Sequence, residues 1–337
     1  MSKKRIVVIC PGRGTYTRET IKYLRDCNQD SASIIKWIDK EREIKNIPSL
    51  TNLDSMQFKS KTHMSGENAS PLIYACSLKD FLNINQKKYD IVAITGNSMG
   101  WYTALTLAGV FTYKTGYNII QTMGSMMKDK IIGGQIIYPI VDDEWQIDND
   151  IKDKVLSAIQ SEDAYTSIIL GGYIVIGAEQ RVLDKLLKIL PKIDQYPQQL
   201  PYHGAFHTPL LESISTKAFN SIPESHFNKP AIPLIDGLGN IWSPFSSNIS
   251  DLYQYTLGTQ VTSTYNFTKA ISVAIKEFCP DNLVLLGPGN TLGGAVGQIL
   301  IQNKWDGINS KKSFSKKQLN DTYLISMGIN DQCKMVS

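Results

Sequence analysis

The chain has 337 residues, of which 42% are hydrophobic, and its formal net charge is +4. This length allows a sizeable core, organised as one large domain with a smaller inserted or appended unit. This small net charge does not argue for nucleic-acid binding, because nucleic-acid binders usually carry a concentrated basic face. It is compatible with an acidic protein partner. No apolar stretch approaches the roughly 20 residues of a membrane span, so we expect no membrane contact.

The cysteines and the first residues point to a reducing compartment. The five cysteines are scattered, form no CxxC pair and occupy positions 10, 27, 76, 279 and 333. This pattern predicts neither a disulfide framework nor a structural metal site. The apolar run after the initial lysines is too short for a signal peptide. We therefore expect a cytoplasmic protein, and we expect it to be a monomer.

The first 129 residues alternate between predicted strands and helices. Apolar runs at 5–10 and 89–96 are typical of buried strands, and the first is stopped by "PGRG". Residues 37–68 are polar and predict short helices and loops. Helical spacing predicts helices at 17–27, 70–84, 100–110 and 113–127. This order predicts a parallel sheet covered on both faces, in an α/β core whose first part spans 1–129.

Residues 130–201 have a different pattern and predict an inserted subdomain. The predicted order is strand, helix, hairpin, helix and strand, at 133–141, 148–161, 166–178, 179–190 and 196–202. This is the order of a small ferredoxin-like unit. Residues 202–303 then return to the core and end in a strand, glycine turn and helix at 282–300. Residues 304–337 are expected to be a polar C-terminal segment, whose lysine-rich part at 304–317 is a mobile or surface segment.

The stretch "ITGNSMGWYTAL" places Ser98 between two glycines, where a predicted strand meets a predicted helix. This is the setting of a nucleophile elbow, in which a sharp turn exposes the serine at the carboxyl end of the sheet. Flanking glycines permit such a turn, and the helix N-terminus favours developing negative charge. The alternative is a glycine-rich turn in which the serine only caps the helix.

A serine nucleophile needs a base, and the chain has four histidines. His63 lies in a polar stretch and is expected to be exposed, and His226 is expected in a loop. His203 and His207 share "PYHGAFHTPLLE", where the chain re-enters the core. A histidine there can lie at the floor of a cleft, although either one alone is better explained as a hydrogen-bonded structural histidine.

These blocks resemble the malonyl-CoA:acyl carrier protein transacylases and the acyltransferase domains of polyketide synthases. The resemblance extends to about residue 302 and rests on ordered blocks, namely "PGRGTY", "GNSMGWYTALTLAGV", "GAFHTPLL", "STYNFTKAI" and "LLGPGNTL". It implies an α/β-hydrolase-like core with a mostly parallel sheet plus the inserted ferredoxin-like subdomain.

The resemblance also assigns roles to residues. It makes Ser98 the nucleophile and His207 the base, with the NH groups of Met99 and Arg13 as the oxyanion hole. Backbone carbonyls near the block of Asn266 would orient the histidine in place of a carboxylate. The implied reaction is ping-pong transfer from an acyl thioester through Ser98 to the phosphopantetheine thiol of an acyl carrier protein. Acyl-CoA and the carrier are then substrates, and no permanently bound cofactor, metal or nucleotide is expected.

One departure from the family pattern concerns the acyl group. Malonyl-specific members have an arginine that grips the free carboxylate, in a block that reads "QTMGSMM" in this chain, so that Met123 takes its place. A thioether cannot pair with a carboxylate, and an unpaired carboxylate in a closed pocket costs several kcal/mol. The sequence therefore predicts a substrate that is not a dicarboxylic acyl group, unless Met123 is only core packing on its helix.

Other pocket positions also depart from the family. Asn97 stands where histidine is usual, and Gly204 opens a "GAFH" block whose Phe206 keeps the malonyl-like form. The missing bulk at Gly204 is expected to enlarge the pocket. Arg13 replaces a glutamine, and three roles stay open for it: replacing the lost guanidinium from another wall, binding the phosphate of the pantetheine arm, or facing solvent.

Two other functions stay open from sequence alone. One is an acyl hydrolase that clears acyl groups from carrier proteins, in which water resolves the acyl-enzyme of Ser98. The other is a non-catalytic docking protein that kept the fold, which the altered motif positions would allow. Against the second, both predicted reacting residues are present.

Overall fold

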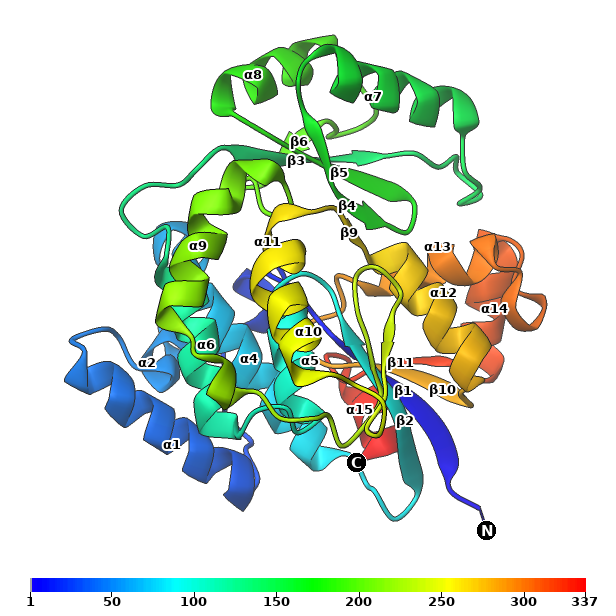
Figure 1. Ribbon diagram of the computed structural model, residues 1–337. Coiled ribbons are helices and arrows are strands. Elements are labelled where there is room, and N and C mark those ends of the chain that lie inside the picture. Colours follow the sequence, from blue (N-terminus) through cyan, green and yellow to red (C-terminus); the bar gives the residue numbers. More distant parts are fainter. Residues whose placement is uncertain (1) are drawn as a thin grey trace.

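The computed structural model describes residues 2–337 and contains two sheets (Figure 1). The larger sheet has the strand order β11-β10-β1-β2-β7-β8 and is parallel except for the edge hairpin of β7 and β8. Its strands are β1 (Lys4–Cys10), β2 (Tyr89–Gly96), β7 (Leu234–Ile235), β8 (Ile241–Trp242), β10 (Asn282–Leu285) and β11 (Leu324–Ser326). The central strand β1 is buried from Ile6 to Cys10, as its continuous apolar run predicts for a strand covered on both faces.

Helices cover both sides of this sheet, with α1, α2, α4 and α6 on one side and α12, α13 and α14 on the other (Figure 1). The helices outside the small subdomain are α1 (Gln29–Ile44), α2 (Leu50–Ser55), α3 (Ser60–His63), α4 (Gly66–Asn83), α5 (Gly100–Leu107), α6 (Tyr113–Ser125), α9 (Glu212–Ser221), α10 (Ile249–Gln254), α11 (Gln260–Thr262), α12 (Phe267–Phe278), α13 (Gly293–Gln302), α14 (Lys311–Asn320) and α15 (Asn330–Val336). Within residues 2–337, no helix is both long and apolar enough to cross a bilayer.

The smaller sheet has the order β6-β3-β5-β4-β9. Its elements are β3 (Gly134–Pro139), α7 (Asn149–Ser161), β4 (Tyr165–Leu170), β5 (Tyr173–Ala178), α8 (Gln180–Ile189), β6 (Gln198–Gln199) and β9 (Tyr265–Asn266). The chain order and the arrangement of β3 to β6 are those of a ferredoxin-like unit, which confirms that part of the fold prediction. The strand β9 comes from the core and pairs parallel with β4, so it joins the small sheet to the large one.

The small sheet is apolar on both faces, and this explains where the cavity described below lies. Ile136 and Ile176 belong to a separate hydrophobic cluster with residues of α7 and α8, the two helices that lie over the small sheet in Figure 1. Ile137 and Val175 alternate with them along the strands and point to the opposite face, toward the large core. The inner face of the subdomain thereby becomes one wall of the space between the two sheets.

The predicted helix over 17–27 is wrong, because these residues form only a short 3-10 turn at Arg18–Thr20. The carboxylate of Asp54 accepts hydrogen bonds from the NH groups of Tyr23 and Leu24, at 3.0 and 2.9 Å. Lys22, with a φ of 71°, has left-handed backbone that ends any helix there. The polar residues 37–68 contain short helices as expected, but their first part belongs to the 16-residue helix α1.

The C-terminal residues are more ordered than the sequence predicted. The lysine-rich part does form a surface helix, α14, which has no buried residue. Leu324 and Ile325, however, are buried in β11, which extends the large sheet parallel to β10. The expectation of a polar segment after residue 303 overlooked this short apolar run, whose burial on the edge of the sheet completes the core.

Candidate active site

The turn around Ser98 has the geometry of a nucleophile elbow. Ser98 lies between the end of β2 and the start of α5 and has a φ of 54°. A Cβ on Gly96 would lie 2.3 Å from the backbone of Gly100, and one on Gly100 would lie 2.3 Å from the carbonyl oxygen of Cys10. Both glycines are therefore required by close backbone contacts, and the left-handed conformation they support turns the serine into the cavity.

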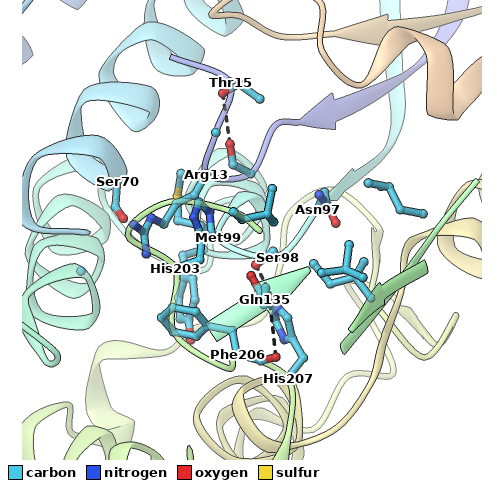
Figure 2. Close-up of a pocket in the computed structure, with 18 of the residues that line it drawn as sticks. Arg13, Thr15, Ser70, Asn97, Ser98, Met99, Gln135, His203, Phe206 and His207 are labelled. Carbon is cyan, nitrogen blue, oxygen red and sulfur yellow. Dashed lines mark hydrogen bonds between the residues drawn. The ribbon is translucent and has the colours of Figure 1, made fainter. Parts of the chain in front are cut away.

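His207 is the histidine that meets this serine. Its Nε2 lies 2.7 Å from the Oγ of Ser98, and the two side chains face each other in Figure 2. Its Nδ1 lies 2.5 Å from the backbone carbonyl oxygen of Gln260. Because a carbonyl only accepts hydrogen bonds, Nδ1 carries the proton and Nε2 is left to accept the hydroxyl proton of the serine. The orienting group is thus a backbone carbonyl, that of Gln260, which lies six residues before Asn266 in the chain.

Gln260 holds both partners of this pair. Its carbonyl fixes the imidazole, while its side-chain Nε2 donates to the carbonyl oxygen of Ser98 at 3.1 Å. The hydroxyl of Tyr102 donates to the Oε1 of Gln260 at 3.1 Å, which fixes that side chain. A further bond, from the hydroxyl of Tyr265 to the carbonyl of Gly96, ties the end of β2 to β9. Apart from the resemblance, which pointed to carbonyls near the block of Asn266, no local motif marks Gln260, because its bonds to Ser98 and Tyr102 join segments more than 150 residues apart.

Burial sets the protonation state of the base. His207 is 2% exposed, and desolvation lowers its pKa to about 4, against the opposing effect of the hydrogen bond to Gln260. The imidazole is therefore neutral at physiological pH and able to accept a proton.

The two predicted oxyanion donors lie beside this pair. Met99 and Arg13 line the same cavity as Ser98, and within residues 2–337 neither backbone NH has an acceptor. Met99 directly precedes α5, so its NH points out of the first turn of that helix. Their role in stabilising an oxyanion stays a prediction.

The site opens into a cavity of about 230 Å³ between the two sheets (Figure 2). Met123, Phe206 and Asn97 line it, as the sequence predicted. Most of the remaining wall is apolar and comes from the small sheet and from segments around the core, with Ile137, Ile168, Leu170, Val175, Leu200, Val261 and Leu292. This cavity offers an apolar environment for an acyl thioester next to the serine.

Comparisons with known proteins point to one family. No protein-family model matches the chain. The chain is 23% identical over 254 residues to the polyketide biosynthesis malonyl CoA-acyl carrier protein transacylase of Bacillus subtilis, covering 74% of this chain and 80% of that protein. It is 24% identical over 231 residues to the malonyl CoA-acyl carrier protein transacylase of Synechocystis, covering 68% and 73%. These relatives support the assignment of the chain to the malonyl-CoA:acyl carrier protein transacylase family.

Solved structures of this transacylase family share the fold. The crystal structure of the malonyl-CoA:ACP transacylase of Synechocystis covers 98% of this chain, with 99% of its own length matched, a TM-score of 0.74 and 18% identity. The enzyme of Helicobacter pylori covers 99%, with 97% of its own length matched, a TM-score of 0.75 and 16% identity. At these identities the likeness establishes the α/β architecture with its second sheet.

Two positions that the transacylase pattern placed in the pocket lie elsewhere. Gly204 lines a neighbouring cavity of about 210 Å³, and a Cβ there would lie 2.7 Å from the Cε of Met127. Its missing bulk therefore makes room for Met127 and does not enlarge the cavity at Ser98. Asn266 caps α12 by accepting a hydrogen bond from the NH of Lys269 at 2.8 Å, and it does not line the cavity.

The other three histidines of this transacylase homologue make no hydrogen bond with Ser98. The expectation that His63 is exposed is wrong, because its ring is fully buried, stacks on Phe58 and has its Nε2 2.9 Å from the carbonyl of Leu53. His226 is exposed in a loop, as expected. His203 lines the cavity, but its Nδ1 lies 2.9 Å from the carbonyl of Pro201, and no bond joins it to the serine.

Proposed function

We propose that this protein transfers an acyl group from a thioester to Ser98 and then to the phosphopantetheine thiol of an acyl carrier protein. The observation that carries the proposal is the 2.7 Å contact between Ser98 and the neutral His207 at the end of an apolar cavity. The curated relatives, named as malonyl CoA-acyl carrier protein transacylases, support the two thioester partners and a role in polyketide or fatty acid biosynthesis.

In the first half-reaction, the Oγ of Ser98 attacks the thioester carbonyl while its proton passes to the Nε2 of His207. The tetrahedral oxyanion accepts hydrogen bonds from the NH groups of Met99 and Arg13. When the intermediate collapses, the C–S bond breaks, and the leaving thiolate takes the proton from His207. The products are a free thiol and an ester on Ser98.

The second half-reaction is the reverse with a new thiol. The carrier's phosphopantetheine thiol gives its proton to the Nε2 of His207 and attacks the ester carbonyl. Collapse breaks the ester C–O bond, and the alkoxide of Ser98 recovers the proton from His207. The carbonyl of Gln260 stabilises the imidazolium in both halves, because it accepts the Nδ1 proton throughout. No step needs a bound cofactor.

The acyl group is a separate question. Met123 is 9% exposed at the cavity wall and, taken alone, favours an acyl chain without a terminal carboxylate. That prediction holds only if Arg13 does not replace the lost guanidinium from another wall. Preference for an acyl group without a terminal carboxylate is therefore the competing outcome of the substrate experiment described below.

The proposal is tested by incubating the protein with acyl-CoA and a phosphopantetheinylated acyl carrier protein and following both masses. We expect acyl transfer to the carrier with the wild type, and its loss in Ser98→Ala and His207→Ala. Matched controls are Ser161→Ala and His226→Ala, which change an exposed serine at the end of α7 and the exposed loop histidine. Release of free acid without acyl-carrier formation would identify a hydrolase, and turnover by Ser98→Ala at the wild-type rate would refute the mechanism.

A further inference from the structure

The Arg13 guanidinium lies at the cavity wall without a counter-anion. Its Nη2 donates to the backbone carbonyls of Met64 and Tyr202, at 2.9 and 2.7 Å. Its Nε is buried without any partner, and its Nη1 has no acceptor in the part of the chain that the structure describes. None of the ion pairs among residues 2–337 includes Arg13.

This guanidinium keeps its charge at neutral pH, because burial lowers its pKa only to about 10. A partly buried cation whose nitrogens meet only carbonyl oxygens is stabilised when an anion joins it. The unpaired nitrogens therefore point to a missing anionic partner.

A second unpaired polar group lies beside it. Ser70 is 2% exposed and lines the same cavity, and its hydroxyl makes no hydrogen bond within residues 2–337. Figure 2 shows the guanidinium of Arg13 directed toward Ser70. A hydroxyl without a hydrogen bond and a guanidinium with an unpaired Nε line the same cavity, and both can donate to an oxygen anion.

Close helix packing places this pair at the wall of Met123. A Cβ on Gly66 would lie 2.4 Å from the carbonyl oxygen of Gly124 and 3.7 Å from the Nη1 of Arg13. A Cβ on Gly124 would lie 3.3 Å from the Cβ of Ser70. The two glycines let α4 and α6 touch, so the guanidinium lies next to Gly66 and the Cβ of Ser70 lies next to Gly124, the residue that follows Met123.

The position limits which anion can bind. The backbone of Arg13 lies at the reacting centre with Ser98, and its side chain stays along the cavity wall. The phosphate of a carrier or of CoA is separated from the thioester by the whole pantetheine arm, which is far longer than an arginine side chain. An anion near Met123 therefore belongs to the acyl group itself.

We propose that Arg13, with Ser70, binds the terminal carboxylate of a short dicarboxylic acyl group. The cation reaches the wall of Met123 from the loop after β1 instead of from α6, and the thioether of Met123 packs against the acyl chain. Arg13 is then the residue that determines specificity. This inference rests on the proposed function, because it requires that Ser98 is acylated.

The experiment compares malonyl-CoA with isovaleryl-CoA, whose terminal isopropyl group has the shape of a carboxylate but no charge. Acylation of Ser98 is followed by rapid quench and intact-protein mass spectrometry. We expect the wild type to favour malonyl-CoA, and Arg13→Gln to lower the malonyl-to-isovaleryl rate ratio by roughly 100-fold or more, the effect of removing one partner of a buried charge pair. Ser70→Ala should lower the ratio by about 10-fold, as for one lost buried hydrogen bond.

A rescue variant separates recognition from structure. The double variant Arg13→Gln with Met123→Arg returns a guanidinium to the same wall from α6 and should restore the preference for malonyl-CoA. A wild type that is acylated by isovaleryl-CoA but not by malonyl-CoA would overturn this inference alone. An Arg13→Gln variant that slows both substrates equally would also overturn it, because Arg13 would then only tie down the loops of Met64 and Tyr202. Absence of acylation by any thioester would overturn the proposed function as well.

Discussion

The low pKa of His207 predicts that Ser98 is acylated almost as fast at pH 5.0 as at pH 7.5. The base must be neutral to take the serine proton. With the pKa lowered to about 4 by burial, about 90% of the imidazole is neutral at pH 5.0. With the ordinary histidine pKa of about 6.5, only about 3% would be neutral. The two cases differ by roughly 30-fold in the acylation rate at pH 5.0.

The assay is a single-turnover acylation at several pH values between 4.5 and 8, quenched with acid and read by intact-protein mass spectrometry. Single-turnover conditions isolate the first half-reaction from carrier binding and release. Circular dichroism at each pH checks that the protein stays folded, and Ser98→Ala gives the background. A rate that falls with an inflection near 6.5 would refute the conclusion that the cavity desolvates His207.

Three other predictions test the local geometry. Gly100→Ala should lower the free energy of unfolding by more than about 3 kcal/mol, measured by urea denaturation, because its Cβ would lie 2.3 Å from the carbonyl oxygen of Cys10. Gln260→Ala keeps the backbone carbonyl but loses the bond to Ser98, and the acylation rate should fall roughly 10- to 100-fold at a temperature where circular dichroism shows the variant to be folded. Burial raises the pKa of Asp80 to about 6, so its contribution to stability is present at low pH and lost as the pH rises through 6. Between pH 7.5 and 5.0 the wild type should gain about 1.4 kcal/mol relative to Asp80→Asn in urea denaturation, and equal pH dependence would contradict this.

The sequence predicted best where local pattern decides the structure. The apolar run before Ser98, the flanking glycines and the helix after them determine the elbow through contacts within a few residues. The ferredoxin-like order followed from alternating strands and helices for the same reason. The predicted helix over 17–27 failed because Asp54, thirty residues away, takes up its backbone NH groups.

The site was harder to predict where contacts join distant segments. His207 could be placed only through the family resemblance, because nothing local marks it as closer to Ser98 than His203. Gln260 carries no motif, and its role depends on the backbone path between α10 and β9. Gly204 faces away from the cavity because Met127 fills the adjacent space, which spacing alone does not reveal.

The charge at the pocket wall shows the same limit. From the sequence, Met123 marks the loss of the guanidinium that malonyl-specific members carry, and its replacement by Arg13 from another wall is one of three open roles. In the structure, Arg13 lines the same cavity as Met123 from a loop 110 residues earlier, and its guanidinium lies next to Gly66, which contacts Gly124. The sequence could not decide among the three roles of Arg13, because the choice depends on contacts between distant segments.

The most direct test of the proposed acyl-enzyme is a pulse-chase measurement on the protein itself. The wild type is exposed briefly to acyl-CoA, digested, and mapped by mass spectrometry, before and after addition of phosphopantetheinylated carrier protein. We predict that the acyl mass is found on the peptide containing Ser98 and that it moves to the carrier thiol during the chase. Acyl mass on another residue, or carrier acylation at an unchanged rate by Ser98→Ala, would contradict the account.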